Sequence, residues 1–449
     1  MYGLHEKYIA SMKLQATLFV VVAVFGEAFS GKLLLILLDG FRWDYFDQGL
    51  NLPAFTEIFR RGVRARQLVP AYPPVSYPNH YTLLTGLYVE SHGFVGNEMY
   101  DVTTGKTYSP WFDNLTAADR SFMYDDSEPL WISAVKQNKR VYMFHWVGCE
   151  VTIQGRQPTY CRRHTDVPSI ADLRRDLDDS VELFLNSSAD LAVVYHEKVD
   201  DDGHRYGPMT SKVNSAIQEV DEELGRMLKK LASPDLGDTV DVMIFSDHGM
   251  TTISPSQVVN VSHVLPTSSV DVILNGYGSH VYIWPKPGRL QEVYNALKDY
   301  SPYYTAYLKE DIPARWHFQH HRRVPPILLA AKMPWYIDTP NFGYYAYDTG
   351  PMLGEHGFDP AQADMSGIFT AFGPSFVPGM TSEKLPNVDL YQIMCNILNI
   401  KPRSHNGTWS RVSHMIKDVS GSRPLQSALT VVVLCIILAF LNTWCLPNQ

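Results

Sequence analysis

Four short runs of almost uninterrupted apolar residues constrain the fold more than any other feature of this 449-residue chain. A strand with one wet face alternates apolar and polar residues, so an unbroken apolar run predicts a strand that is buried on both faces. Strands of this kind occur in mainly parallel sheets that lie between layers of helices. The four runs are Leu33 to Leu38, Val141 to Phe144, Leu191 to Tyr195 and Val240 to Phe245.

Helical patterns separate these runs, and a further strand and helix follow them. Ile170 to Leu185 and Val213 to Leu231 carry apolar residues at helical spacing. Gly367 to Gly373 is typical of a strand, and Leu390 to Leu398 of a closing helix. We therefore predict an α/β fold with a mainly parallel central sheet between helix layers. The rhythm breaks from about Asn275 to Tyr347, where Pro, Tyr and Trp are frequent, and this favours an inserted subdomain or lid.

The composition is that of a globular protein, with 45% hydrophobic and 19% charged residues. The formal net charge of -9 comes without a basic stripe, and such a stripe is what collects the phosphates of a nucleic acid. We therefore expect no nucleic-acid partner and favour a small or zwitterionic substrate. A homodimer is compatible with this composition.

The amino-terminal segment, residues 1–30, predicts a signal peptide. Lys13 supplies a positive charge, Leu18 to Phe25 is apolar, and small residues follow from Ala28 to Gly31. The alternative is a membrane anchor, but the apolar stretch is much shorter than the roughly 20 residues that a span needs.

The carboxyl-terminal segment, residues 421–449, predicts a signal for a glycosylphosphatidylinositol (GPI) anchor. Small residues from Ser420 to Ser422 precede a short spacer and an apolar tail from Ala428 to Leu441. A single-span helix reaching Leu446 is the alternative. Both readings place one catalytic domain, residues 31–420, on the extracellular face of the plasma membrane.

The cysteines and glycosylation sequons agree with export. Cys149 and Cys161 bracket a loop that contains Gly and Pro, and could form one disulfide in an oxidising compartment. Cys395 lies in an apolar helical run, which predicts a buried thiol. Four Asn-X-Ser/Thr sequons begin at Asn114, Asn186, Asn260 and Asn406.

Polar residues of catalytic type follow the first predicted strand and a Pro-rich turn. Asp39 ends the first apolar run before Gly40, which presents a carboxylate at the sheet edge. Ser76 follows Pro73 and Pro74 and would begin a helix through Leu84, where a hydroxyl meets the free N–H groups of the helix start and suits a phosphoryl group. Taken singly, each residue is better explained as part of an ordinary helix cap.

Residues suited to metal coordination follow two more predicted strands. Asp200 and His204 are four residues apart, so both side chains can hold one ion. Asp247 and His248 form an adjacent pair after another strand and offer one oxygen and one nitrogen. His356 lies between glycines. For the other histidines, including His80, His92, His320 and His321, the default expectation is a surface role.

These residues lie in five motifs, in an order that resembles the ecto-nucleotide pyrophosphatase/phosphodiesterase family of the alkaline phosphatase superfamily. The resemblance spans about Lys32 to Met415. The motifs are LLDGFR at Leu37 to Arg42, SYPNHYTLLTG at Ser76 to Gly86, DDDGHRYGP at Asp200 to Pro208, FSDHGM at Phe245 to Met250 and GEHGFDP at Gly354 to Pro360.

The resemblance implies an alkaline-phosphatase-like fold, two zinc ions and a catalytic Ser76, where many relatives carry threonine. Asn97 matches the position at which the family holds a phosphoryl oxygen with an amide. The implied zinc ligands are Asp200, His204 and His356 for one ion, and Asp39, Asp247, His248 and the Ser76 hydroxyl for the other. A phosphoserine would form on Ser76 and then be hydrolysed.

Within the family, the chain is most similar to the choline-specific glycerophosphodiester phosphodiesterase branch, which also acts as a lysophospholipase C. The similarity is carried by Val141 to Glu150, Gln157 to Cys161 and Tyr195 to Asp200. It implies phosphocholine release from glycerophosphocholine or lysophosphatidylcholine. Choline is a permanent cation that needs aromatic faces and a carboxylate, so Tyr160, Tyr195 and Glu197 are the expected pocket residues, with core packing as the alternative for the tyrosines.

Two other functions are compatible with the same residues. A nucleotide pyrophosphatase/phosphodiesterase would use identical zinc chemistry. A catalytically inactive cell-surface binding protein would have lost at least one ligand, and all seven ligand positions are filled here. A sulfatase is disfavoured because its motif requires Arg four residues after the nucleophile, where this chain has His80.

Overall fold

The computed structural model describes residues 31–108, 124, 127–234, 236, 239–340, 346–347 and 350–417. The predicted signal peptide, the predicted anchor and the sequon at Asn114 lie outside these ranges. Within them, no helix combines the length and apolar character needed to cross a membrane.

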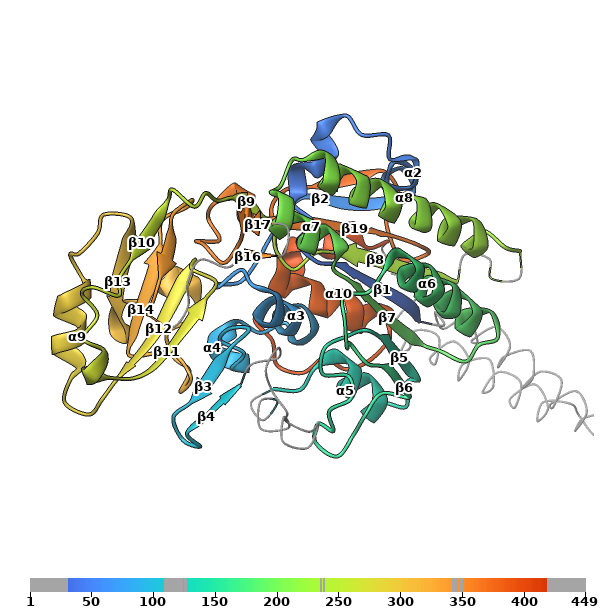
Figure 1. The fold of residues 1–449 in the computed structure, drawn as a ribbon. Coiled ribbons are helices and arrows are strands. Elements are labelled where there is room, and N and C mark those ends of the chain that lie inside the picture. Colours follow the sequence, from blue (N-terminus) through green and yellow to red (C-terminus); the bar gives the residue numbers. More distant parts are fainter. Residues whose placement is uncertain are drawn as a thin grey trace, which may run out of the picture.

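A nine-stranded sheet forms the centre of the larger lobe, in the order β20-β2-β19-β8-β1-β7-β5-β6, with β21 also paired to β2. Figure 1 shows it running between layers of helices. Only β19 is antiparallel to its neighbours, so the prediction of a mainly parallel sheet is confirmed. The strands are β1 (Lys32–Leu38), β2 (Gly62–Val69), β5 (Val141–Phe144), β6 (Tyr160–Arg162), β7 (Leu191–His196), β8 (Val240–Phe245), β19 (Gly367–Phe372), β20 (Met380–Ser382) and β21 (Leu385–Pro386).

The central strand β1 explains why its apolar run is unbroken. Leu33, Leu35 and Leu37 pack into one core cluster, whereas Leu34 and Ile36 pack into the other. Both faces are therefore dry, and each fully buried side chain of this size contributes about 1.5–3 kcal/mol relative to exposure. Helices α2 (Pro53–Arg61), α6 (Ile170–Leu185) and α8 (Ser211–Leu231) cover one face, and α3 (Ser76–Thr85), α5 (Leu130–Lys136) and α10 (Leu390–Ile397) cover the other.

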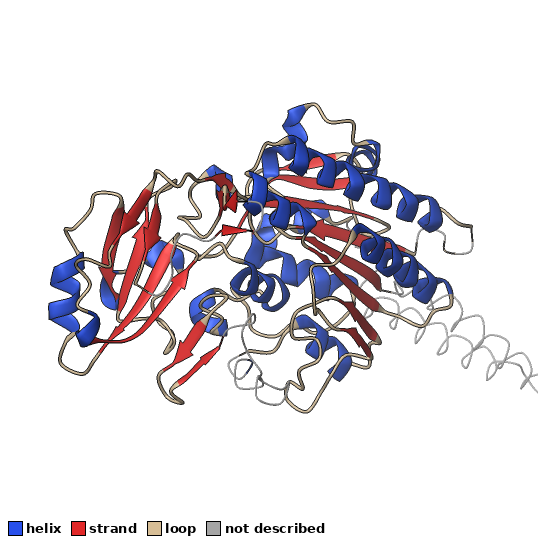
Figure 2. Cartoon of the chain, in the orientation of Figure 1, coloured by secondary structure: helices blue, strands red, loops and turns tan. Residues whose placement is uncertain are grey.

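The predicted break in rhythm corresponds to a smaller lobe that begins slightly earlier than Asn275. A four-stranded antiparallel sheet, in the order β11-β12-β14-β13, packs with α9 around a core of its own. Figure 2 shows this second group of strands beside the main sheet. The elements are β11 (Val270–Gly276), β12 (His280–Pro285), α9 (Leu290–Leu297), β13 (Tyr304–Leu308) and β14 (Ile327–Ala331).

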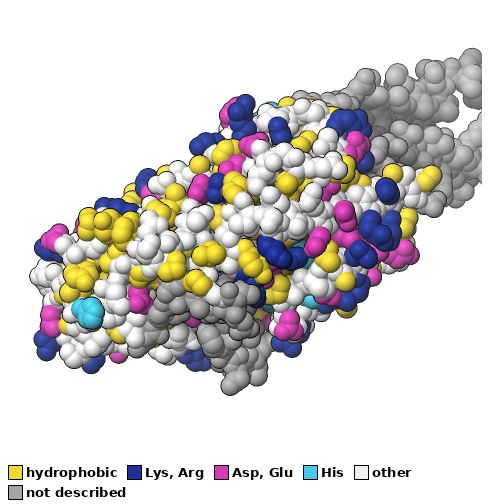
Figure 3. Space-filling view, turned by 45° about the horizontal axis from the view of Figure 1, so that its top comes forward, with side chains coloured by type: hydrophobic (Ala, Val, Ile, Leu, Met, Phe, Trp, Pro, Cys, Tyr) yellow, Lys and Arg dark blue, Asp and Glu magenta, His cyan; other side chains and the backbone are white. Residues whose placement is uncertain are grey.

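Shorter elements complete the described fold. They are α4 (Val89–His92), the hairpin β3 (Met99–Asp101) and β4 (Lys106–Tyr108), α7 (Lys198–Tyr206), the pair β9 (Thr251–Thr252) and β18 (Gly354–Glu355), the pair β10 (Val258–Asn260) and β15 (Tyr336–Asp338), and the pair β16 (Ala346–Tyr347) and β17 (Gly350–Pro351). On the surface shown in Figure 3, basic and acidic side chains are interspersed rather than gathered into a basic stripe.

The register of three parallel strands brings their carboxyl ends to one edge of the sheet. Leu38 of β1 pairs with His196 of β7, and Leu37 pairs with Phe245 of β8. The residues that follow these strands therefore leave the sheet side by side. This edge is where ligands bind in open α/β sheets.

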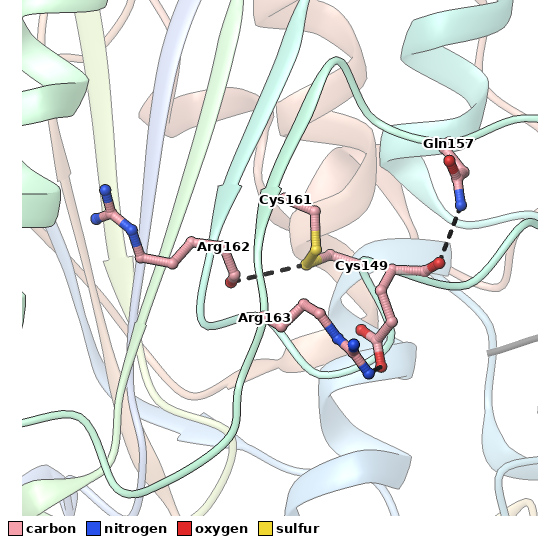
Figure 4. Close-up of a disulfide and its surroundings, with 6 residues drawn as sticks. Cys149, Gln157, Cys161, Arg162 and Arg163 are labelled. Atoms are coloured by element: carbon pink, nitrogen blue, oxygen red, sulfur yellow. Dashed lines mark hydrogen bonds and ion pairs between the residues drawn. A yellow bond between two sulfur atoms is a disulfide. The ribbon is translucent and has the colours of Figure 1, made fainter. Parts of the chain in front are cut away.

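The predicted disulfide between Cys149 and Cys161 is present, with Cα atoms 5.7 Å apart. It links the loop after β5 to the edge strand β6, and Figure 4 shows the surrounding contacts. Arg163 approaches Glu150 beside the bridge, at 3.9 Å. The prediction of a buried thiol at Cys395 is also confirmed.

Removing this disulfide should destabilise the protein. Cys149→Ser/Cys161→Ser should lower the free energy of unfolding by about 3 kcal/mol, because the bridge closes a short loop in the unfolded chain. Urea denaturation measures the change. Reductant should bring the native protein to the midpoint of the double variant and leave that variant unchanged; an equal effect of reductant on both would contradict a stabilising bridge.

Candidate active site

Asp39 and Asp247 occupy the sheet edge, directly after β1 and β8. The Asp39 amide donates to the His196 carbonyl at 2.9 Å, and the Gly40 amide donates to Asp247 Oδ1 at 3.2 Å. Gly40 has a φ of 63°, and a Cβ there would lie 2.4 Å from Asp200 Oδ1. Glycine is therefore required for the turn that lets three carboxylates converge.

Ser76 is the first residue of α3, as predicted, and its Oγ lies 3.3 Å from His248 Nε2. The turn before it is held by Asn79, whose Nδ2 donates to the carbonyls of Pro73 and Val75 at 3.0 and 2.9 Å. The hydroxyl sits at the positive end of the helix, where an anionic group is stabilised. Asn79 is a positioning residue that the motif contained without revealing its role.

Asp200 and His204 lie one turn apart on α7, and His356 follows β18 beside them. His204 Nε2 is 3.3 Å from Asp200 Oδ2 and 3.2 Å from His356 Nε2. His356 Nε2 is also 3.8 Å from Asp200 Oδ1. The structure thus brings together the three side chains expected to hold the first ion.

The second predicted set also converges. His248 Nε2 lies 3.4 Å from Asp39 Oδ1 and 3.4 Å from Asp247 Oδ2. The imidazole of His248 stacks on that of His356, with ring centroids 3.6 Å apart, so the two sets are adjacent. All seven residues predicted as ligands therefore lie in one cluster.

Backbone carbonyls orient all three ligand imidazoles. His204 Nδ1 lies 2.9 Å from the Gly354 carbonyl, His356 Nδ1 lies 2.9 Å from the Pro74 carbonyl, and His248 Nδ1 lies 3.0 Å from the Gly249 carbonyl. A carbonyl only accepts, so each Nδ1 carries the proton in the neutral ring. The Nε2 lone pair is then directed to the cluster, as metal-binding histidines require.

The donor set fits divalent cations. Asp39 Oδ1 and Asp200 Oδ1 are buried and receive no hydrogen bond from any residue that the structure describes. The Nε2 atoms of His204 and His356 face each other at 3.2 Å, an unfavourable contact between lone pairs unless a cation or a proton lies between them. Close groups of potential ligand atoms occur among Asp200, His248 and His356, among His204, Glu355 and His356, and among Asp39, His80 and Asp247.

Burial strongly perturbs the ionisation of these groups in the absence of metal. Burial raises the pKa of Asp200 to about 7, with His204 acting in the opposite direction. Burial alone would lower the pKa of His204, but the Asp200 carboxylate raises it to about 10. Burial also lowers the pKa of His248 to about 4. The cluster therefore holds protons at neutral pH where metal ions would otherwise balance the carboxylates.

The expectation of a surface role is wrong for three histidines. His80 is 4% exposed, His92 is fully buried, and His321 is 7% exposed. His80 Nε2 lies 3.0 Å from Asp247 Oδ2 and 3.6 Å from Asp39 Oδ2, so it joins the two carboxylates that follow β1 and β8. Its position one turn after Ser76 on α3 could have suggested this, because residues four apart share a helix face.

Asn97 lies beside the nucleophile, as predicted. Its Oδ1 accepts a hydrogen bond from the Tyr77 amide at 2.9 Å. Because that oxygen is engaged, the amide Nδ2 is the group left to donate to a substrate. Asn97 also lines a small recess with Val75 and Tyr277.

Tyr195 and Glu197 lie next to the metal-ligand cluster, but their polar atoms are already engaged. The Tyr195 hydroxyl is 2.5 Å from Asp39 Oδ2 and 2.8 Å from Glu197 Oε2. The other carboxylate oxygen of Glu197 lies 2.8 Å from His164 Nε2. Tyr195 is only 3% exposed. These contacts make Tyr195 a support for Asp39, and the sequence did not indicate His164.

The structure does not bring Tyr160 to this cluster. Tyr160 begins β6 and pairs with Tyr142 of β5. Tyr142 pairs with Ala192 of β7, and Ala192 pairs with Leu34 of β1, so Tyr160 lies level with Leu34 along the strands. That level lies roughly 15 Å along the strands from Asp39, and three strand spacings add a similar distance sideways. The tyrosine ring instead packs near Tyr142, with ring centroids 6.0 Å apart.

Comparison with known proteins identifies the family. The model of the family "Type I phosphodiesterase / nucleotide pyrophosphatase" matches residues 33–359. Human ectonucleotide pyrophosphatase/phosphodiesterase family member 5 is 34% identical over 388 residues, 86% of this chain and 78% of the relative. Human family member 7 is 34% identical over 400 residues, 88% of this chain and 85% of the relative. Bovine bis(5'-adenosyl)-triphosphatase ENPP4 is 34% identical over 392 residues, 86% and 82% of the two chains.

Solved structures of relatives have the same fold. Human ENPP5 has a TM-score of 0.79 and 33% identity, covering 86% of this chain and all of the solved chain, 100%. Inactive murine ENPP5 in complex with AMP has a TM-score of 0.77 at the same identity and coverage. Fold and site define an alkaline-phosphatase-like phosphoester hydrolase with a metal-ligand cluster. The chain belongs to the ectonucleotide pyrophosphatase/phosphodiesterase family.

Metal affinity should rise with pH. The metal-free His204 imidazole, with its pKa of about 10, carries a proton at neutral pH that must leave before Nε2 can bind an ion. Each displaced proton makes affinity increase by about tenfold per pH unit. Zinc competition with a fluorescent chelator between pH 6 and 8 measures the slope. His204→Gln should weaken binding, and His263→Gln, at an exposed position, should not; a pH-independent affinity would contradict the protonated apo site.

Proposed function

We propose that this chain is an exported zinc phosphodiesterase that hydrolyses nucleotide phosphodiesters or pyrophosphates and releases a nucleoside 5'-monophosphate. The observation that carries the proposal is the position of Ser76 Oγ, at a helix start and 3.3 Å from His248 Nε2 within the ligand cluster. A serine hydroxyl is a weak nucleophile on its own, and metal coordination is one way to activate it.

Two zinc ions bound by the two predicted ligand sets would supply that charge, lowering the pKa of the Ser76 hydroxyl and neutralising phosphoryl oxygens. Ser76 Oγ gives up its proton to solvent and forms the new bond to phosphorus, while the bond from phosphorus to the alcohol or phosphate on the opposite side breaks and that group leaves. Asn97 Nδ2 donates to a non-bridging oxygen as charge develops there. Water then cleaves the Ser76 ester, which returns the hydroxyl and releases the monoester.

A tyrosine near Asn97 supports a nucleotide substrate. Tyr277 is half-buried and lines the recess that contains Asn97, whereas Tyr77 is buried in the core. The exposed part of the Tyr277 ring suits a planar base, which stacks without requiring a particular hydrogen-bond pattern. The relatives add support, because one is named as a bis(5'-adenosyl)-triphosphatase and another was solved in complex with AMP.

Choline phosphodiesters are the second candidate substrates. Glu197 places a carboxylate beside the rings of Tyr195 and His164, whose centroids are 5.6 Å apart, and this combination can attract a quaternary ammonium. The two oxygens of Glu197 already have partners, and Tyr160 is remote from the site. The nucleotide assignment is therefore the better supported of the two.

We also propose that the chain acts on the extracellular face of the plasma membrane, held there by its carboxyl-terminal tail. The disulfide supports passage through an oxidising compartment. An inactive binding protein is the remaining alternative. Retention of the complete ligand cluster argues against it, because unused carboxylates and imidazoles would be costly to bury together.

A product assay tests the substrate assignment. The exported protein, given diadenosine triphosphate or an ATP-like diester, should release AMP and lose this activity on chelation and regain it with zinc. Glycerophosphocholine and lysophosphatidylcholine serve as the competing substrates. Release of phosphocholine without AMP would overturn the nucleotide assignment, and failure of both reactions with zinc bound would support the inactive binding protein.

Ser76→Ala should lower kcat by about 10³-fold or more, because no other group can form the covalent intermediate. Single-turnover product release measures the loss, and zinc content should change little. Ser91→Ala, which alters an exposed serine, is the matched control. Substantial turnover by the Ser76 variant would show that another nucleophile carries the reaction.

Asn97→Ala should lower kcat by about 10²-fold, the usual effect of removing one donor to a developing oxyanion. The loss should appear in kcat more than in KM, because the charge increases in the transition state. Steady-state kinetics with the preferred substrate measure both constants. A change confined to KM would assign Asn97 to ground-state binding instead.

A further inference from the structure

Glu355 is a buried carboxylate beside the first ligand set, which consists of Asp200, His204 and His356. It forms β18 with Gly354 and directly precedes His356 in the sequence. Only 1% of its surface is exposed. Its Oε1 accepts a hydrogen bond from the His356 amide at 2.8 Å, whereas its Oε2 has no hydrogen-bond partner among the described residues.

The charge of Glu355 has no fixed counterion in the described part of the chain. No lysine or arginine there forms an ion pair with it, and its ionic contact is with His356 Nε2, which lies 3.9 Å from Oε1. Burying a carboxylate without a paired positive charge is strongly unfavourable. A cation held at this position would remove that penalty.

The backbone of β18 brings Glu355 against helix α7. The Gly354 carbonyl lies 2.9 Å from His204 Nδ1, and a Cβ at Gly354 would clash with the Gly203 carbonyl oxygen. Glycine therefore allows the strand to pack directly on the helix. On its other side, Glu355 pairs with Thr251 of β9, which holds the strand in this position.

The separations between the ligand atoms are compatible with one shared ion. His204, Glu355 and His356 each offer an atom that lies within 4.8 Å of the other two. The two Nε2 atoms are 3.2 Å apart, and Glu355 Oε1 is 3.9 Å from His356 Nε2. Two atoms that bind one zinc ion at 2.0–2.2 Å can lie up to roughly 4.3 Å apart, so both separations satisfy this limit.

We propose that Glu355 is a fourth protein ligand of the first ion, together with Asp200, His204 and His356. Without it, the first set holds one carboxylate and the second holds two, those of Asp39 and Asp247. Glu355 gives the two sets equal numbers of carboxylates, and a zinc ion with four protein ligands can still accept a fifth from the substrate. This inference rests on the divalent ions of the proposed function and is independent of the substrate.

A pair of substitutions tests coordination against a backbone-positioning role. Stepwise zinc competition with a fluorescent chelator should show that Glu355→Gln and Glu355→Ala each bind one of the two ions about 10²-fold more weakly than the native chain. Gln keeps an oxygen that can accept from the His356 amide but lacks the charge. If Glu355 only positioned His356, Glu355→Gln would bind zinc as the native chain does, and this result would overturn the proposal.

Glu128→Gln is the matched control. Glu128 is also a buried carboxylate, but it accepts hydrogen bonds from Ser133 and Lys136, both at 2.6 Å, and belongs to neither ligand set. Its substitution should leave both zinc affinities unchanged. An equal loss of zinc affinity in Glu128→Gln would show that the effect of Glu355→Gln reflects a general loss of stability, contrary to the proposal.

Cobalt provides a spectroscopic test of the same ligand. At saturating cobalt, Glu355→Gln should change the visible absorption bands of the bound ion, because these bands depend on the number and type of ligands. A weaker zinc affinity with an unchanged cobalt spectrum would show that Glu355 acts through its charge without binding the ion, and would overturn the proposal. Since the probes are the metals themselves, a native chain that binds two zinc ions but releases no AMP would overturn only the nucleotide assignment.

Discussion

The register that holds β1 between β7 and β8 is the constraint on which the site depends. It aligns three carboxyl ends of parallel strands, so Asp39, Asp247 and Glu197 leave the sheet within reach of one another. A slip of one residue would move every side chain of β1 from one core cluster into the other, where it would have to pack against different neighbours. The hydrophobic core therefore determines the spacing of the catalytic charges.

Burying these charged groups together raises the free energy of the folded state, and contacts within the cluster reduce this cost. Burial and the nearby Asp247 both raise the pKa of Asp39, while His80 and Tyr195 direct protons toward the same carboxylate. Backbone carbonyls fix the ligand imidazoles before any ion arrives. The site is thus organised in advance for cations, whose binding replaces protons and contributes to folding stability.

Sequence patterns predicted the helices and strands that local sequence determines. They missed contacts between residues that are far apart in the sequence. The unbroken run at Leu33 to Leu38 identified a buried strand, and ordered motifs placed seven ligands in one cluster. The role of His80 depends on carboxylates that follow two other strands, and the one local signal was its position four residues after Ser76 on α3. Tyr160 was expected to offer an aromatic face to choline, but the register of β6 places it toward the opposite end of the strands.

Helix α3 connects the chemistry to the outer surface of the larger lobe. Its first residue is Ser76, and Asn79 holds the preceding turn through carbonyls on either side of Pro74. Its last turn ends at Gly86, whose left-handed conformation and contact with Tyr391 exclude a side chain. Asn406 binds the Gly86 carbonyl. Because both ends are fixed by different parts of the chain, the nucleophile keeps its position without needing contacts from substrate.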